Sequence, residues 1–401
     1  MEQARATCHE AVFAPLTQSG MYKRLVREIR GGTQTLPLFG MPENGKAPLL
    51  AALFEQTQRS MLIVCASDFA AQKLYAALEG TLGEAVHLLP MRTVHLSKAR
   101  VQDKQNQGLR AAALDALCGP TPGIVVASVD AARARLLPVQ TFASNGFTLQ
   151  TGEQLDLLDL AEALERAGYA RVETVDAYGQ FAVRGGIVDV FLPNANAYRI
   201  DFFGDEIDSI RILDPLSQRS SEAVEQCRIC PAIEMPLNAR QAKHALDAIH
   251  RAHRGAQGET LVRLNNLYLA IEQGDYSTAY EVASLFLPTV TAADYLPAGG
   301  LLCLDEPMRL NDAAQSTDTD IATAVRDLAQ KGEEPRGWDK HLAPYAMFKA
   351  PEGISTLRFS APVSYTHLDV YKRQSHNFPD VLINIAAPHH QNQIARLPTL
   401  P

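Results

Sequence analysis

The sequence has no long apolar run and no N-terminal pattern of charged residues followed by apolar ones. A helix needs about 18 consecutive apolar residues to cross a membrane, and a secretion signal needs a charged start followed by an apolar core. The 401 residues therefore indicate neither membrane insertion nor secretion. We predict a cytoplasmic protein with no membrane partner.

Positive charge is also scarce, because 37 lysines and arginines stand against 45 aspartates and glutamates, a net charge of −8. Broad, sequence-independent binding of nucleic acid needs a basic surface that neutralises phosphates. The composition therefore argues against such binding as the main role of the chain. The hydrophobic content of 46% is ordinary for a soluble protein with real cores, and the length suggests two to four domains.

The six cysteines are scattered and form no paired framework. Cys65 and Cys303 lie in apolar runs and are expected to be reduced core residues. Cys227 and Cys230 form a lone C-x-x-C motif without a second pair nearby, which is weak support for a zinc or redox site. We predict no metal site.

The strongest pattern in the chain is the strand-like stretch from Gly168 to Pro215. Its second half alternates apolar and charged residues over 198–203 and then reverses at Gly204-Asp205, a two-residue hairpin signal. Its first half groups β-forming residues around Gly185-Gly186, where we expect a bulge or a close backbone approach. The stretch predicts a small antiparallel sheet.

A helix is expected just before this sheet, because the apolar residues of 154–167 have helical spacing and Gly168 stands at a C-cap position. One helix followed by three or four strands predicts a compact α+β unit of roughly 70 residues. Four arginines lie on it, several alternating with apolar residues: Arg171, Arg184, Arg199 and Arg211. They form either the solvated outer face of the sheet or, beside aromatic residues, a protein-binding surface.

Nearer the N-terminus, residues 36–54 have the order of a phosphate-binding loop, with a strand, a glycine-rich turn and a helix. Gly40, Gly45 and Lys46 keep the G-x4-G-K spacing, but Ala47 stands where a serine or threonine would hold Mg²⁺. The loop also contains a proline, which has no N–H to donate, and a glutamate, which repels phosphate. We predict a degenerate loop that does not bind nucleotide.

Apolar runs at 61–66, 85–89 and 123–129, separated by helical patterns, predict a doubly wound α/β domain. Residues 301–304 are apolar and end at Asp305-Glu306, as in a degenerate Walker B strand, whose acid would hold Mg²⁺. Together with the loop at 40–47, this strand predicts that the α/β domain resumes after an inserted module. The alternative left open is a nucleotide-dependent enzyme that uses Lys46 and Asp305.

These motifs together resemble the N-terminal region of the bacterial transcription-repair coupling factors, the Mfd family. The resemblance covers roughly residues 20 to 360 and rests on GMPENGKA, on the segment from Gly168 to Ser220, and on LLCLDEP. The excision-repair subunit UvrB shares this region but has an intact phosphate loop and a full motor, so Ala47 and Pro307 point to the coupling factors. The implied fold is α/β, with a degenerate P-loop, RecA-like (UvrB-like) domain split by a small α+β domain.

The resemblance implies four parts. They are domain 1a at 1–137, an inserted UvrA-binding domain 2 at 138–215, domain 1b at 216–350, and a linker with the start of a third domain at 351–401. Within the last part, residues 364–374 (SYTHLDVYKRQ) do not continue the surrounding pattern and look like translated adapter sequence. We expect these residues to be non-native and the chain to be a fragment.

The function implied by the resemblance is non-catalytic recruitment of UvrA, which links a stalled RNA polymerase to nucleotide excision repair. The inferred contact residues are Arg171, Phe181, Arg184, Arg199 and Phe203. No cofactor is expected here, because ATP and Mg belong to the DNA translocase motor of the full-length family member, which would also bind RNA polymerase and double-stranded DNA. The alternatives are a nucleotide-binding, UvrB-like helicase or ATPase domain, and direct DNA binding.

Overall fold

A computed structural model of the chain describes residues 14–92, 94, 104–194, 196–361 and 383–384. Residues 364–374, for which a non-native origin was predicted, lie outside the described residues. Most of the predicted linker at 351–401 lies outside them as well.

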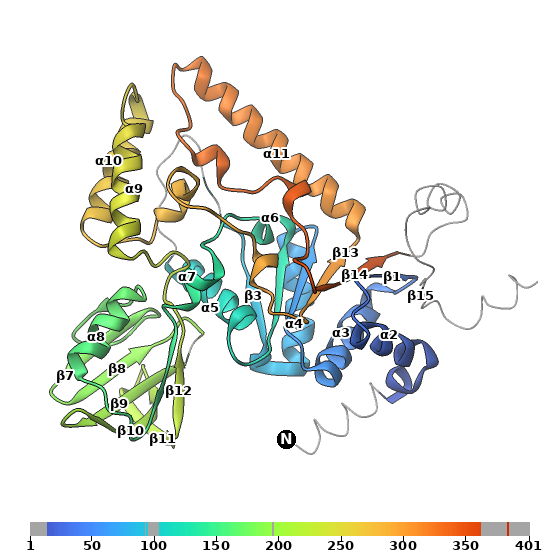
Figure 1. The fold of residues 1–401 in the computed structure, drawn as a ribbon, viewed down its shortest axis with the longest axis horizontal. Helices are drawn as coiled ribbons and strands as arrows, with labels where there is room; N and C mark the ends of the chain where they lie inside the picture. Colours follow the sequence, from blue (N-terminus) through green and yellow to red (C-terminus); the bar gives the residue numbers. More distant parts are fainter. Residues whose placement is uncertain (1–13, 93, 95–103, 195, 362–382, 385–401) are drawn as a thin grey trace, which may run out of the picture.

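A parallel sheet with the strand order β15-β1-β14-β13-β2-β4-β3 forms the centre of the larger domain, which we call the body (Figure 1). Its strands are β1 (Thr35–Phe39), β2 (Met61–Cys65), β3 (Val86–Leu89), β4 (Ile124–Ser128), β13 (Leu301–Asp305), β14 (Ser355–Ser360) and β15 (Ile383–Asn384). Every residue of β2 and β4 is buried, as expected for parallel strands covered on both faces. Strand β13 pairs with both β14 and β2, so residues far apart in the chain complete one sheet. The predicted α/β domain split by an insertion is confirmed.

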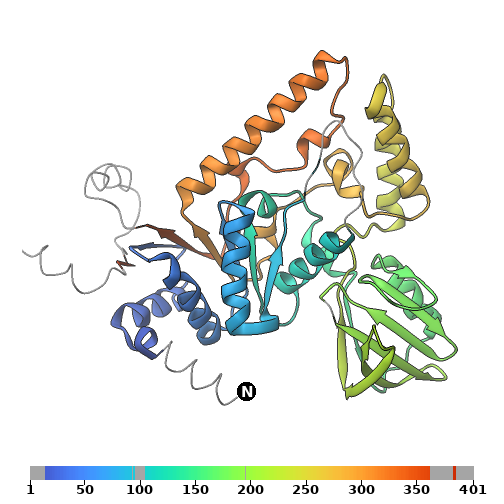
Figure 2. The same ribbon diagram turned by 180° about the vertical axis from the view of Figure 1, so that it is seen from behind.

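Helices cover both faces of this sheet. Alternate residues of its strands therefore belong to two separate apolar cores. One core includes α2 (Gly20–Arg30), α3 (Glu43–Thr57) and α4 (Asp68–Leu82). The other includes α5 (Lys104–Cys118), α6 (Val129–Ala132), α7 (Val139–Ala143) and residues along the length of the long helix α11 (Pro307–Gln330). Seen from behind, α4 lies in front of the strands (Figure 2).

The region between β4 and β13 leaves the body and forms two further sheets, which we call the insert (residues 147–229). A six-stranded sheet has the order β11-β10-β9-β8-β7-β6, and a two-stranded sheet pairs β12 with β5. The bounds are β5 (Phe147–Gln150), α8 (Leu157–Arg166), β6 (Ala170–Arg171), β7 (Gln180–Arg184), β8 (Ile187–Phe191), β9 (Ala197–Phe203), β10 (Glu206–Asp214), β11 (Arg219–Val224) and β12 (Gln226–Ile229). All neighbouring strands are antiparallel except β6 and β7.

The insert has more strands than the three or four predicted. The predicted boundary at residue 215 falls before β11 and β12, which continue its sheets. Strand β11 reads RSSEAV and has little apolar alternation, so its pairing with β10 could not be recognised from the residues.

The glycines of the insert show one confirmed turn and one correction. Gly204 has a φ of 63° and turns β9 into β10, as predicted. Gly185-Gly186 does not form the predicted bulge within a strand, because it is the turn between β7 and β8, with Gly185 at a φ of 61°. A Cβ atom on Gly186 would lie 3.1 Å from the carbonyl oxygen of Phe202, so the expected close backbone approach is present.

After the insert, a helical hairpin of α9 (Ala239–Ala252) and α10 (Gly258–Glu272) projects from the body beside the insert (Figure 1). Short 3-10 helices complete the structure: η1 (Gly83–Ala85), η2 (Ala279–Leu285), η3 (Ala292–Tyr295), η4 (Trp338–Lys340) and η5 (Tyr345–Met347). Within the described part of the chain, no helix combines the length and the apolar character that a membrane crossing requires.

Contacts with α5 join the insert to the body. Arg228 of β12 donates to both carboxylate oxygens of Asp115, at 2.7 and 3.3 Å. Glu234, which follows the insert, accepts a 2.9 Å hydrogen bond from Arg110 Nε and lies 3.3 Å from Arg92 Nε. All three side chains of this second group are buried. Charged contacts therefore contribute to holding the insert on the body.

Candidate partner-binding surface

The six-stranded sheet of the insert has one apolar face and one mixed face, where Ala182, Ala197 and Leu213 form a small core with Val175 beside the charged residues. The residues of the apolar face pack with Leu160, Ala161 and Leu164 of α8 and form a core. Because side chains alternate along a strand, the intervening residues point to the opposite side. That side, which we call the arginine face, carries Arg184, Asp189, Arg199, Asp201, Phe203 and Arg211.

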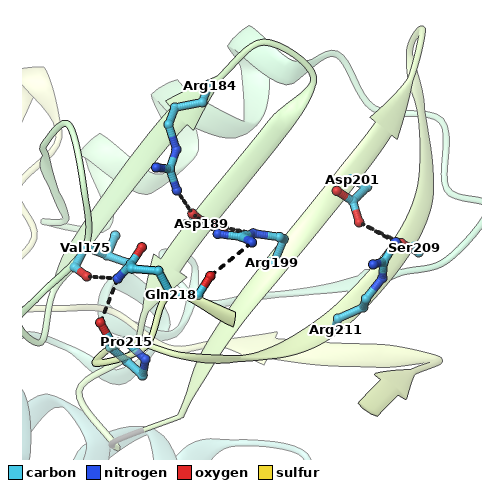
Figure 3. Close-up of polar contacts among 9 residues, drawn as sticks. All are labelled: Val175, Arg184, Asp189, Arg199, Asp201, Ser209, Arg211, Pro215 and Gln218. Atoms are coloured by element: carbon cyan, nitrogen blue, oxygen red, sulfur yellow. Dashed lines mark hydrogen bonds and ion pairs between the residues drawn. The ribbon is translucent and has the colours of Figure 1, made fainter. Parts of the chain in front are cut away.

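Asp189 is the centre of the arginine face. Its side chain is fully buried, and its two carboxylate oxygens accept hydrogen bonds from Arg199 Nε at 2.7 Å and from Arg199 Nη2 at 2.8 Å. Arg184 donates to the same carboxylate from β7 (Figure 3). The hydrogen bond to Asp189 raises the pKa of Arg199 above its ordinary value. One buried carboxylate thus orients two arginines from neighbouring strands.

Arg184 is more accessible to a partner than Arg199, whose Nη1 also donates to the carbonyl oxygen of Gln218 at 3.4 Å. The side chain of Arg184 is 46% exposed and that of Arg199 is 17% exposed. On the next strand, Arg211 lies 3.1 Å from Asp201 and is 43% exposed, and Ser209 bridges the pair (Figure 3). The arginine face therefore offers guanidinium groups whose positions are already fixed.

Phe203 adds an apolar contact to this charged surface. It is the last residue of β9, two positions after Asp201 and four after Arg199, and it is 83% exposed. A large exposed aromatic side chain on the same face as oriented arginines is typical of a protein-binding hot spot. The structure thus places three of the five predicted contact residues, Arg184, Arg199 and Phe203, on one face of the sheet.

The other two predicted contact residues lie elsewhere. Phe181 is fully buried in the core beneath α8, so the prediction that it contacts a partner is corrected by its burial. Arg171 is exposed on the short edge strand β6, in register with Phe181, and has no part in the contacts of Asp189. The residues alone do not reveal this division, because a shift of one position in register moves a side chain to the other face.

Asp189 was missed at the sequence level. The signal available was a single carboxylate inside the otherwise apolar strand β8, IVDVF. A buried carboxylate is rarely found without a partner. The two arginines at alternating positions on the adjacent strands were the candidates for that partner.

The second candidate site is the loop that follows β1. The structure begins α3 at Glu43, so Gly45, Lys46 and Ala47 lie in the first turns of the helix and only Gly40 remains in the loop. The N–H of Gly45 donates to the carbonyl oxygen of Pro42 at 2.9 Å. A Cβ atom on Gly45 would approach Met41 Sδ to 2.7 Å. The N–H of Gly45, which would contact a phosphate, is therefore engaged within the chain, and Met41 packs against Gly45.

Lys46 is buried, and carboxylates hold its ammonium group. Its Nζ donates to Asp305 Oδ1 at 2.6 Å and to Glu43 Oε2 at 2.7 Å. Burial lowers the pKa of Lys46, but the hydrogen bonds from Lys46 to these two carboxylates outweigh it and raise the pKa above the ordinary value. The neighbouring Glu306 is the N-cap of α11 with a φ of 58°, and burial raises its pKa. The lysine and acid expected to serve a nucleotide thus neutralise each other.

Replacing Lys46 with alanine is expected to leave ATP binding unchanged. We expect neither the wild type nor the Lys46→Ala variant to bind MgATP with a Kd below about 1 mM. The ammonium group is already engaged, and Ala47 offers no hydroxyl to the metal ion. Isothermal titration with MgATP measures this directly. Mg-dependent binding by the wild type that the Lys46→Ala variant loses would instead favour a nucleotide-binding function.

The C-x-x-C motif has no third ligand within the described ranges, where no cluster of three or more histidines, cysteines or acids could hold a metal. Burial raises the pKa of Cys227 and of Cys230 to about 12, so both are neutral thiols. The carbonyl oxygen of Cys230 accepts a 2.7 Å hydrogen bond from the Tyr169 hydroxyl. The motif joins the end of β12 to the core of the insert.

Comparison with known proteins finds a family that matches the insert and relatives that match most of the chain. A family described as the UvrB interaction domain matches residues 147–235, which contain β5 to β12 and α8. The transcription-repair-coupling factor of Bacillus subtilis (strain 168) is 26% identical over 331 residues, which cover 79% of this chain and 28% of that protein. That of Staphylococcus haemolyticus (strain JCSC1435) is 23% identical over 353 residues, which cover 83% of this chain and 29% of that protein.

The chain thus spans less than a third of the length of these relatives. The alignments take in most of the body as well as the insert, in agreement with the motifs at 40–47, 168–220 and 301–307. Over most of its length the chain is homologous to the N-terminal region of the transcription-repair-coupling factors, and its residues 147–235 match the UvrB interaction domain.

Proposed function

We propose that this chain is a non-catalytic module that recruits UvrA through the arginine face of its insert. The observation that carries the proposal is that Phe203, which is 83% exposed, lies on the same face of the sheet as Arg184 and Arg199, both held by the buried Asp189. The match to a UvrB interaction domain supports it, since UvrB and the coupling factors would present the same sheet face to UvrA.

The physical basis is that oriented arginines lose little side-chain freedom on binding. A free arginine loses about 2 kcal/mol of rotamer entropy when it is fixed, whereas Arg199 is already held by a bidentate contact. The N–H groups of Arg184, whose side chain is 46% exposed, can pair with carboxylates on UvrA, and Arg199 adds its charge beside them. Phe203 would fill an apolar pocket at the centre of the contact and exclude water from those pairs.

In the whole protein, we propose that this recruitment links RNA polymerase stalled at a lesion to nucleotide excision repair in the cytoplasm. ATP hydrolysis and movement along double-stranded DNA would belong to parts of the full-length protein that follow this region. The second candidate function, nucleotide binding by the body, is not favoured, because Lys46 is paired with Asp305 and Glu43.

Replacing Phe203 with alanine is expected to weaken UvrA binding by about 2 kcal/mol or more, roughly 30-fold, because a hot-spot aromatic side chain is removed. The measurement is a titration of purified UvrA with the whole chain, in which we expect micromolar or tighter binding by the wild type. The Arg184→Ala variant should weaken binding in the same direction.

Matched controls come from α8, on the opposite side of the sheet. Leu158 is 65% exposed and Arg166 has a 63% exposed side chain, so Leu158→Ala and Arg166→Ala remove similar groups from another face. Both should bind UvrA as the wild type does. Equal weakening by the control variants, or no binding by a folded wild-type chain, would refute the proposed surface.

A further inference from the structure

Helix α9 of the body has a basic exposed face that the proposed function does not use. Its buried side is made of Ala242, Ala245, Ala248 and Ile249. The exposed side, which we call the basic stripe, carries Arg240, Lys243, His244, Asp247, His250 and Arg251. Arg254 follows just after the helix and is also exposed.

The basic stripe is narrow and straight. At 100° per residue, its six side chains fall within an arc of about 120°, and at 1.5 Å per residue Arg240 and Arg251 lie roughly 17 Å apart along the axis. The helix continues without a kink-forming residue over this length. The stripe therefore presents a linear row of charge.

Local charge on α9 is opposite in sign to that of the chain. Residues 239–254 contain four lysines or arginines and one acid, a net charge of +3, whereas the whole chain carries −8. None of Arg240, Lys243, Arg251 and Arg254 forms an ion pair with another described residue. By contrast, Arg110, Arg133, Arg199 and Arg228 are all paired with carboxylates.

A surface hollow of about 370 Å³ opens beside the middle of the stripe. It is lined by His244, Asp247 and Arg251 and by residues 284–287. Asp247 is the only carboxylate of the stripe, and it forms no ion pair with a described residue. An anion that lies along the stripe would meet three or four cations and this one opposing charge.

We propose that the basic stripe of α9 binds the phosphate backbone of double-stranded nucleic acid. Protein interfaces usually have an apolar core, but none of the strongly exposed large apolar side chains lies on α9. The nearest apolar side chains are Leu285, Phe286 and Leu287, which line the hollow and are only partly exposed. A row of lysines and arginines along a helix is suited to phosphates, which are contacted by charge and without sequence readout. The acidic composition of the chain does not oppose this, because the field near the row is set by the nearest charges.

The test is fluorescence anisotropy of a labelled duplex of mixed sequence titrated with the whole chain at several salt concentrations. Three phosphate contacts predict weak binding whose logarithm falls with the logarithm of salt concentration with a slope of about −3. A variant that combines Arg240→Ala, Lys243→Ala and Arg251→Ala should lose at least about tenfold in affinity at low salt and most of this slope.

A charge-matched control keeps the result specific. The variant with Arg166→Ala, Arg326→Ala and Lys349→Ala removes the same charge from three exposed positions outside α9 and should retain both affinity and slope. A variant that binds the duplex more tightly provides a second measurement, because a misfolded variant would not gain affinity. Asp247→Ala should tighten binding a few-fold, whereas Asp312→Ala on α11 should not.

Three results would overturn the proposal. The first is no duplex binding by the wild type at low salt, and the second is an equal loss in both triple variants. The third is that the chain binds polyglutamate and not the duplex, and that this binding depends on Arg240, Lys243 and Arg251. This last outcome would assign the stripe to an acidic protein segment.

Discussion

Replacing Glu234 with alanine is expected to lower the free energy of unfolding by about 4 kcal/mol, because it leaves two buried arginines without their carboxylate. Arg110 and Arg92 both lie against Glu234, and no side chain of the three is more than 3% exposed. Burial already lowers the pKa of Arg92 to about 10, and the charge of Glu234 opposes that shift. The remaining contacts of Arg92, a 2.8 Å hydrogen bond to the carbonyl oxygen of Arg135 and the Tyr280 ring, cannot neutralise two cations.

Urea unfolding followed by tryptophan fluorescence measures this effect, since Trp338 is the sole tryptophan of the chain and is buried in the body. Glu234→Gln keeps a hydrogen-bond acceptor and should fall between the wild type and Glu234→Ala, which gives a reading even if the alanine variant does not fold. The control is Glu222→Ala on the exposed face of β11, expected to change stability by less than about 0.5 kcal/mol. A Glu234→Ala variant as stable as this control would show that the buried cluster is not stabilised by its carboxylate.

Replacing Asp189 with alanine is expected to destabilise the insert by about 3 kcal/mol and to abolish the orientation of both arginines. The expected loss is smaller than for Glu234, because only Arg199, which is 17% exposed, would remain largely covered without a carboxylate. Arg184 is 46% exposed and can turn toward water. UvrA binding should weaken at least as much as in the Phe203→Ala variant, since the arginines would have to be ordered at the moment of binding.

Two probes separate the insert from the body in this experiment. Far-UV circular dichroism follows the β-rich insert together with the rest of the chain, whereas Trp338 fluorescence follows the body alone. Asp189→Ala should move the circular dichroism transition to lower urea and leave the fluorescence transition nearly in place. Asp208→Ala, an exposed position at the irregular pairing of β10 with β9, serves as control. Unchanged stability together with unchanged UvrA binding would contradict the role assigned to Asp189.

The parts of the fold that depend on local pattern could be predicted from the sequence. The continuous apolar runs of β2 and β4 identified buried parallel strands, and Gly204-Asp205 identified a hairpin. The acid at the end of β13 was correctly associated with the loop after β1, although Lys46 and Asp305 are 259 positions apart. These predictions succeeded because periodicity and turn chemistry are read within a few residues.

The parts that depend on register and burial could not be predicted. Phe181 and Phe203 are both aromatic residues of the same sheet, yet one is fully buried and the other is 83% exposed. Only the pairing of β7, β8 and β9 decides which side each faces. The carboxylates of Asp189 and Glu234 were missed for a related reason, since a buried ion pair is formed by residues that meet only in the folded chain.

The measurement that tests the central claim most directly is hydrogen exchange of the whole chain with and without purified UvrA. We expect UvrA to protect the turns at 185–186 and 204–205, which flank Arg184 and Phe203, and to leave α8 unchanged. Protection over 157–166 or over the loop at 40–47, with no change at the two turns, would contradict recruitment through the arginine face.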